Sequence, residues 1–265
     1  MNIYLQELRM SYKSMIYWTV GICSLVVLYM SMFQAMSQDY GVIQKIASKF
    51  PEQLRRALGL SNLDLSKVIG FYGFIFVYIL LFGSIYAMKS GMGALSEEVR
   101  SKTADFLLAK PVKRITVAIA KLFSILTMLV IQNSVYCMVS FACLTLFGKM
   151  GFDASIFYLI SISLMLVQLF FVSLGLFMSA LITKIKTVLP PSLGVVFGFF
   201  MLYIVSQSVN DPKLAYLTPF AYFETARVIE SGGYSVSHYA ANIAAAVAFT
   251  AAACFIYCRK DMPSV

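Results

Sequence analysis

Charged side chains are scarce in this sequence. They make up 12% of the 265 residues, against roughly 25% in an average soluble domain. Apolar residues, counted as Ala, Val, Ile, Leu, Met, Phe, Trp, Tyr and Cys, make up 60%. A soluble fold needs a polar face on its surface elements, and so few charges cannot supply one. The composition therefore excludes a soluble domain and indicates that a lipid bilayer is the solvent for most of the chain.

Groups that carry catalytic chemistry are also few. The chain has one histidine, His238, and it has neither a Gly-x-Ser-x-Gly nucleophile motif nor a Gly-x-x-x-x-Gly-Lys-Ser/Thr phosphate loop. Its five cysteines all lie within apolar runs, which argues against a disulfide framework and against a zinc site. We therefore expect no catalytic, metal or cofactor site in this chain, and we expect that it is not an enzyme.

Long apolar runs are what the sequence does contain. Six intervals of at least 21 residues hold no Asp, Glu, Lys or Arg, and about 20 such residues suffice for a helix to cross a bilayer. We predict an all-α integral membrane protein with a single transmembrane domain over residues 1–265, in which residues 1–15 form an interfacial helix on the inner side. The predicted spans are residues 16–36, 68–88, 115–147, 156–182, 188–209 and 239–258.

The basic residues predict how the chain is oriented. The net charge is +9, and an even number of spans places both termini on one side. If that side is the cytoplasm, thirteen of the 21 Lys and Arg residues lie on it, as the positive-inside rule requires. We therefore expect cytoplasmic termini, and we interpret the basic excess as a topology signal rather than as nucleic-acid binding.

Apart from Lys121, the polar residues inside the predicted spans are neutral. No Asp or Glu occurs there, whereas ion-coupled carriers place ionisable groups inside the bilayer, so a carrier of this kind needs an external motor. Lys121, at the start of the third span, can extend its side chain toward the interface. Two uses remain open for the neutral groups, either lining a translocation path or hydrogen bonding between helices. These candidates are Gln132, Asn133, Gln168 and Gln207.

The connection between the second and third spans, residues 89–114, predicts a short amphipathic helix. Ser96 can cap it, Glu97 and Glu98 follow in the first turn where the helix dipole favours acids, and Pro111 ends it. Such a helix could pass motion from a cytoplasmic partner into the membrane. A surface helix that only anchors the two spans would explain the same pattern.

The same connection carries a resemblance to a known family. Residues 98–114 read EVRSKTADFLLAKPVKR, which resembles the pattern ExRSGTxELLxxPVxR of the membrane subunits of type-2 ATP-binding-cassette (ABC) exporters. Lys102 replaces the usual Gly of that pattern and Asp105 the usual Glu. A second similarity is YLTPFAYF at residues 216–223, where such permeases often carry a Ser-Pro-Phe stretch.

The resemblance implies a transporter in the bacterial cytoplasmic membrane, built from two permease subunits and two copies of a separate ABC ATPase. That ATPase, not this chain, would bind ATP and Mg. The resemblance also places an ATPase-coupling helix between spans 2 and 3. Its candidate residues are Glu97, Glu98, Arg100, Lys102, Thr103, Asp105, Phe106 and Leu107.

Small residues in the fifth span suggest how two copies could meet. Gly194 and Gly198 form a Gly-x-x-x-Gly step that permits close helix approach, either at a homodimer seam or in packing within one chain.

We expect the exporter to move an amphipathic or hydrophobic substrate. Peptides, such as antimicrobial or cytolytic ones, rank ahead of drugs and lipids, and membrane lipids are expected neighbours of the chain. A membrane binding or immunity protein that transports nothing is the alternative.

Overall fold

The computed structural model describes residues 3–34, 41, 49–52, 55, 63–100, 114–148, 151–182, 187–209 and 212–259, without the side chains of residues 97–100, 114 and 212. Within this part of the chain every regular element is a helix. Six of these helices are long and apolar enough to cross a membrane, as the sequence predicts. They are α1 (Ile3–Ser31), α5 (Val68–Arg100), α7 (Arg114–Phe147), α8 (Ala154–Leu181), α9 (Leu189–Val209) and α13 (Val236–Arg259).

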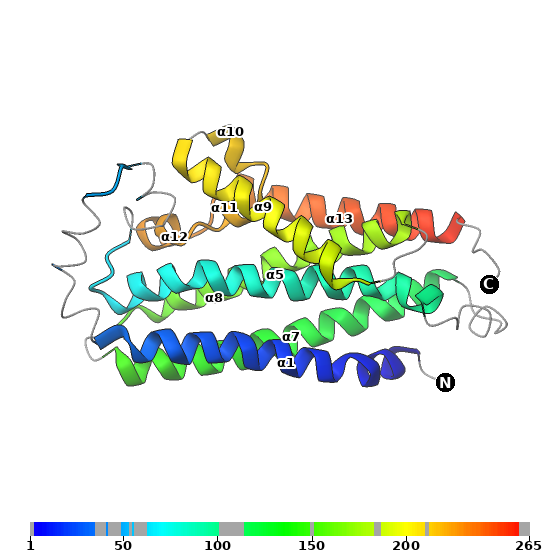
Figure 1. Ribbon diagram of the computed structural model, residues 1–265, viewed down its shortest axis with the longest axis horizontal. Helices are drawn as coiled ribbons and strands as arrows, with labels where there is room; N and C mark the ends of the chain where they lie inside the picture. Colours follow the sequence, from blue (N-terminus) through cyan, green and yellow to red (C-terminus); the bar gives the residue numbers. More distant parts are fainter. Residues whose placement is uncertain are drawn as a thin grey trace.

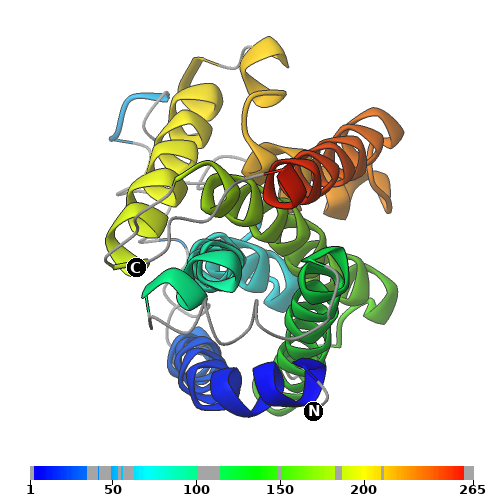
Figure 2. The ribbon, with the colours of Figure 1, turned by 90° about the vertical axis from the view of Figure 1, so that its right-hand side faces the viewer.

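The six helices form one bundle whose long axis follows the helix axes (Figure 1). The start of α1 and the end of α13 lie at the same end, which we name the terminal end, and the opposite end is the distal end. In the view from the terminal end, α5 and α8 occupy the middle, with α1 and α7 on one side and α9 and α13 on the other (Figure 2). An even number of crossings is therefore confirmed, whereas the side of the membrane on which the terminal end lies stays a prediction.

Glycines allow the two central helices to approach closely. A Cβ atom added at Gly91 of α5 would stand 2.2 Å from the backbone oxygen of Val172 on α8. A Cβ at Gly175 of α8 would stand 2.6 Å from the backbone oxygen of Met88 on α5. Only residues without a side chain fit at such a crossing, so these two glycines set the distance between α5 and α8.

The interfacial helix predicted for residues 1–15 is not an element of its own. α1 is continuous from Ile3 to Ser31, so residues 3–15 belong to the same helix as the first span, and their place at the interface stays a prediction. Contacts with two other helices hold its first turns in place: Glu7 pairs with Lys121 of α7, and Ser14 accepts a hydrogen bond from Lys89 of α5. Of the three charged residues in this part of α1, Glu7 thus pairs within the bundle, whereas Arg9 and Lys13 are exposed.

The predicted end of the second span at residue 88 and the Ser96 cap are wrong. α5 runs on to Arg100, and Ser96 is buried inside it, with its hydroxyl donating to the backbone oxygen of Met92 at 2.7 Å. Glu97 and Glu98 therefore belong to the last turn of α5 and not to the first turn of a new helix. The close contact with α8 at Gly91 explains this continuation, because tertiary packing stabilises the helix beyond its apolar stretch.

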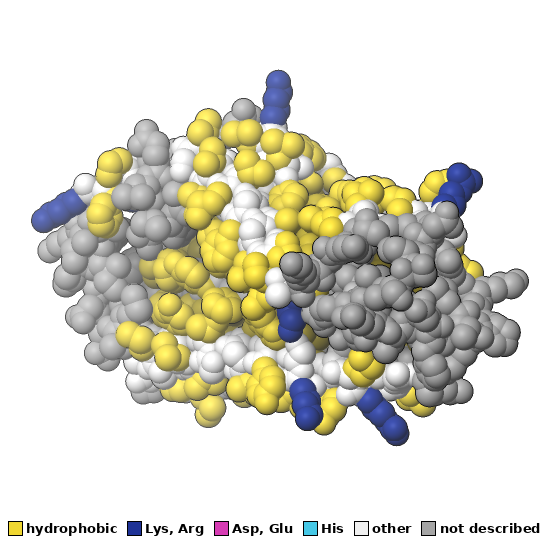
Figure 3. Space-filling model, turned by 45° about the vertical axis from the view of Figure 1, so that its right-hand side comes forward, with side chains coloured by type: hydrophobic (Ala, Val, Ile, Leu, Met, Phe, Trp, Pro, Cys, Tyr) yellow, Lys and Arg dark blue, Asp and Glu magenta, His cyan; other side chains and the backbone are white. Residues whose placement is uncertain are grey.

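Three short helices connect α9 to α13 at the distal end (Figure 1). They are α10 (Pro212–Ala215), α11 (Pro219–Tyr222) and α12 (Thr225–Ser231). Apolar side chains cover much of the surface seen in Figure 3, and the described Lys and Arg side chains on it are scattered rather than clustered. This is a surface that suits lipid tails and protein partners within a membrane.

Candidate functional site

The predicted coupling segment lies at the terminal end. α5 ends at Arg100 and α7 begins at Arg114, and both of these points are at that end of the bundle (Figure 1). Of the candidate residues, Glu97, Glu98 and Arg100 are placed by their backbone only, in the last turn of α5. The remaining candidates, Lys102, Thr103, Asp105, Phe106 and Leu107, lie outside the described residues.

Gln168 of α8 is the centre of a polar cluster that joins three helices. Its side-chain nitrogen donates to the backbone oxygen of Gly83 on α5 and to the side-chain oxygen of Gln132 on α7, each at 3.2 Å. Its side-chain oxygen accepts from the Asn133 amide at 2.6 Å. Gln132 and Gln168 are both fully buried. Hydrogen bonding between helices therefore accounts for three of the four neutral candidates, and their role in a translocation path stays a prediction.

The fourth candidate and the two glycines share α9. Gln207 is half-buried there, on a different helix from those that build the polar cluster. Gly194 and Gly198 are exposed, and a Cβ atom added at either would meet nothing within 4 Å. Packing within one chain therefore does not explain this pair, so the face of α9 that carries them is available to another molecule.

Sequence reasoning missed an ion pair at the terminal end. Nζ of Lys121 lies 2.9 Å from a carboxylate oxygen of Glu7, and the Lys121 side chain is only 2% exposed. The expectation that Lys121 extends into the interface is therefore wrong. Its position in an otherwise apolar helix was the available signal, but the partner is 114 residues away in the chain and no local spacing could identify it.

The sequence YLTPFAYF is built into the distal end of the bundle. Thr218 donates its hydroxyl to the backbone oxygen of Phe199 at 3.0 Å, and Pro219 begins α11. Phe220 is 2% exposed, and its ring centre lies 5.4 Å from that of Phe171 on α8. The stretch therefore inserts α11 between the ends of the long helices and anchors the connection that follows α9.

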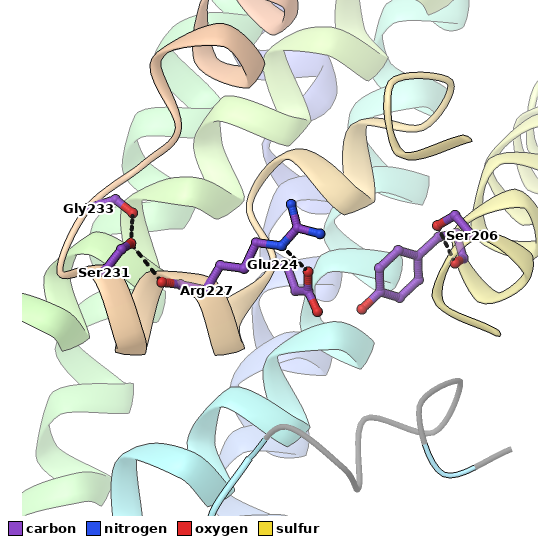
Figure 4. Close-up of polar contacts among 6 residues, drawn as sticks. Ser206, Glu224, Arg227, Ser231 and Gly233 are labelled. Atoms are coloured by element: carbon purple, nitrogen blue, oxygen red, sulfur yellow. Dashed lines mark hydrogen bonds and ion pairs between the residues drawn. The ribbon is translucent and has the colours of Figure 1, made fainter. Parts of the chain in front are cut away.

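A cavity of about 330 Å³ lies beside α12 at this end. Tyr222 and Tyr234 line it, together with Glu224 and Arg227, whose side chains pair at 2.8 Å. Figure 4 shows this pair along α12, and it shows the Ser231 hydroxyl between the backbone oxygens of Arg227 and Gly233. Burial raises the pKa of the Tyr222 phenol, so this hydroxyl stays protonated at physiological pH.

Together these features define a class of protein. The chain is a polytopic helical membrane protein in which the polar groups inside the bundle serve mainly to join helices, and its open apolar faces suit partners within the membrane. The sequence model of the ABC-2 family transporter proteins matches residues 1–262, and the chain belongs to this family. Comparison with curated proteins gives no significant match.

Membership in this family identifies the chain as the permease subunit of an ABC exporter and as a multi-pass protein of the cytoplasmic membrane. Such a subunit has no ATPase of its own, and its family implies an ABC ATPase as partner. This result agrees with the prediction made from residues 98–114.

Proposed function

We propose that two copies of this chain and two copies of a separate ABC ATPase form an exporter for amphipathic or hydrophobic compounds, with peptides as the first substrate class to test. The family match over nearly the whole chain is the observation that carries this proposal. The absence of Asp and Glu from the six apolar intervals supports it, because a carrier without ion-coupling groups depends on an external energy source.

The terminal end faces the cytoplasm in this proposal. Thirteen of the 21 Lys and Arg residues then lie on the cytoplasmic side, in agreement with the positive-inside rule. α5 ends and α7 begins at the terminal end, so residues 101–113 connect the two helices on the side where ATP is available. This placement supports a contact between that segment and the ATPase.

The second copy docks against the helices that the chain itself leaves exposed. The exposed helices differ from the central ones in how much of their most apolar stretch is buried. This buried share is 22% in α1, 22% in α9 and 17% in α13, against 72% in α5 and 78% in α8. Of the three exposed helices, α9 also carries Gly194 and Gly198, which leave its backbone accessible. Small residues of this kind favour close helix association in a bilayer, so α9 is our candidate for the dimer seam.

The test is co-purification of the chain with its ATPase, followed by measurement of ATP hydrolysis and of export in proteoliposomes. The isolated chain should hydrolyse no ATP, because it lacks a phosphate-binding loop. The complex should hydrolyse ATP faster with a transported compound, and a panel of amphipathic peptides, drugs and lipids ranks the substrate classes.

A double variant, Glu98→Ala with Asp105→Ala, tests the contact with the ATPase. Loss of one partner of a desolvated charge pair at an interface costs roughly 2 to 5 kcal/mol. Loss of a solvated surface charge costs about 0 to 1 kcal/mol. The double variant should therefore insert normally but bind the ATPase weakly and lose stimulated hydrolysis, whereas Glu230→Ala at the distal end should leave both unchanged.

Two results would count against the proposal. A double variant that binds the ATPase and couples hydrolysis to export as well as the parent would remove Glu98 and Asp105 from the coupling contact. A chain that binds no ATPase at all would instead fit a membrane protein that transports nothing, and the exporter assignment would fail.

A further inference from the structure

The cavity beside α12 at the distal end is large enough for a small ligand. Its volume of about 330 Å³ is roughly ten times the 30 Å³ that one water molecule occupies in the liquid, and it falls in the range of about 300 to 1,000 Å³ typical of ligand sites. Residues from the end of α11, from α12 and from the start of α13 line it. None of these lining residues belongs to the predicted coupling segment or to the polar cluster around Gln168. The proposed export and coupling therefore assign this cavity no ligand.

Three hydroxyl groups in the lining already donate their hydrogens to backbone oxygens. Tyr222 donates to Tyr216 at 2.6 Å, and Tyr234 donates to Leu159 of α8. The Ser231 hydroxyl donates within α12 at 2.7 Å. A hydroxyl whose hydrogen is engaged in this way can only accept a further hydrogen bond. These groups therefore favour a ligand that donates hydrogen bonds over one that accepts them.

His238 adds a buried acceptor to the same lining. Its ring stacks on Tyr216 with the ring centres 4.5 Å apart, and the residue is 7% exposed. The Nε2 atom is buried and has no hydrogen-bond partner in the part of the chain that the structure describes. A buried polar atom without a partner is unfavourable. When the imidazole carries its proton on Nδ1, Nε2 accepts a hydrogen bond, and a donor in the cavity would satisfy it.

The charges of the lining favour a cation among such donors. Glu224 and Glu230 supply two carboxylates, and Arg227 is the one guanidinium among the described residues that line the cavity. Nε of Arg227 lies 2.8 Å from a carboxylate oxygen of Glu224, and Figure 4 shows its side chain turned toward this partner. Glu230 forms no ion pair within the described part of the chain. With His238 uncharged, one negative charge is therefore in excess. The Glu224 side chain is only 10% exposed, so water screens its charge less than that of an exposed group.

We propose that this cavity binds a primary ammonium group, with Nε2 of His238 and the Glu224 carboxylate as its acceptors. An ammonium group has three N–H donors and no acceptor, and its single charge balances the excess negative charge of the lining. The rings of Tyr222 and Tyr234 add cation–π attraction where the cation lies over their faces. Soluble amines and the headgroups of aminophospholipids both carry this group. The inference concerns the distal end alone and depends neither on the exported compound nor on the ATPase.

The test measures binding of n-butylammonium to the purified full chain in neutral detergent by saturation-transfer NMR. n-Butanol is the comparison compound, because it has the same length and a hydroxyl group in place of the ammonium group. The parent should bind butylammonium about tenfold more tightly, in line with one hydrogen bond to a charged group. Equal affinity for the two compounds would overturn the proposal and leave the cavity to water.

Phosphatidylethanolamine and phosphatidylcholine are then added as competitors, because the choline nitrogen has no N–H donor. Displacement by phosphatidylethanolamine alone would show that the cavity accepts a lipid headgroup. Displacement by neither lipid would restrict the site to soluble amines. Displacement by both would overturn the proposal, since recognition would then not require N–H donors.

Two substitutions that break the same ion pair should shift this affinity in opposite directions. Glu224→Gln should weaken butylammonium binding by about tenfold, because it removes an acceptor and a negative charge. Arg227→Gln should strengthen it, because no cation then competes for Glu224. Asp153→Asn is the matched control, since Asp153 is an exposed carboxylate at the distal end that does not line the cavity, and Asn can also cap α8. Loss of folding cannot explain opposite signs.

A third substitution separates the role of His238 in binding from a structural one. His238→Phe keeps a ring against Tyr216 and removes the unpartnered Nε2 atom. It should weaken butylammonium binding by about tenfold, leave butanol binding unchanged and not lower the free energy of unfolding. Full retention of butylammonium binding by His238→Phe would overturn the proposal. So would a change of the same sign in Glu224→Gln and Arg227→Gln.

Discussion

Replacement of Gly91 by alanine tests whether backbone contact sets the α5–α8 distance. The new Cβ atom would lie 2.2 Å from the backbone oxygen of Val172, far inside van der Waals contact. A flexible side chain could rotate away, but the backbone of α8 cannot, so the two helices must separate. Gly93 provides the matched control on the same helix, because a Cβ atom there would meet nothing within 4 Å.

The expected magnitudes follow from two opposing effects. Alanine is favoured over glycine inside a helix by about 1 kcal/mol, and both substitutions share this gain. Overpacking at a tight contact costs about 1 to 3 kcal/mol, and only Gly91→Ala incurs it. The free energy of unfolding of Gly91→Ala should therefore be lower than that of Gly93→Ala by about 1 to 3 kcal/mol, with Gly93→Ala at or slightly above the parent.

Reversible unfolding by sodium dodecyl sulfate in mixed micelles, followed by circular dichroism, measures this difference. The same experiment on Gly175→Ala should show a loss of similar size, because a Cβ atom there would lie 2.6 Å from the backbone oxygen of Met88. If Gly91→Ala and Gly93→Ala unfold within about 0.5 kcal/mol of each other, the geometric reasoning fails.

Three further predictions concern other parts of the bundle. Lys121→Met should destabilise the chain by about 3 to 5 kcal/mol in the same unfolding assay, because it leaves the Glu7 carboxylate facing an apolar side chain. Adding Glu7→Gln should restore much of this loss, because it removes that charge. Gly198→Leu should not lower the unfolding free energy, because the new side chain would start in open space, but it should reduce dimer formation in crosslinking; an unchanged dimer would exclude this face as the seam. In a cysteine-free background, Ser61→Cys should react with an impermeant thiol reagent added outside and Ser264→Cys should not, and the reverse pattern would invert the topology.

Sequence patterns predicted the ends of a helix well wherever its own apolar stretch determines them. The spans at residues 115–147, 156–182 and 188–209 agree with α7, α8 and α9 to within two residues at each end. The largest errors in helix ends occurred where contacts between helices extend a helix beyond its apolar stretch. In the first half of α1, Glu7 pairs with α7 and Ser14 bonds to α5, and α5 reaches Arg100 because it packs on α8.

The candidate sites divide in the same way. The coupling segment was found from a motif, which is a local pattern, and its contact with the ATPase stays a prediction. The cluster around Gln168 was predicted only as a set of polar residues with two possible uses, and the structure was needed to show that three of them bond to one another. The ion pair between Glu7 and Lys121 was not predicted at all.

The sequence by itself determined that the chain is a membrane protein with six crossings and an ABC exporter motif, because hydropathy, helix length and motif spacing are properties of consecutive residues. The tertiary structure alone decided which distant groups meet. Glu7 and Lys121 pair across 114 residues, and Gly91 faces the α8 backbone while Gly93, on the same helix, faces open space. Periodicity can place a residue on a face of its own helix, but what that face meets depends on how the helices pack, and residue spacing along the chain does not encode this directly.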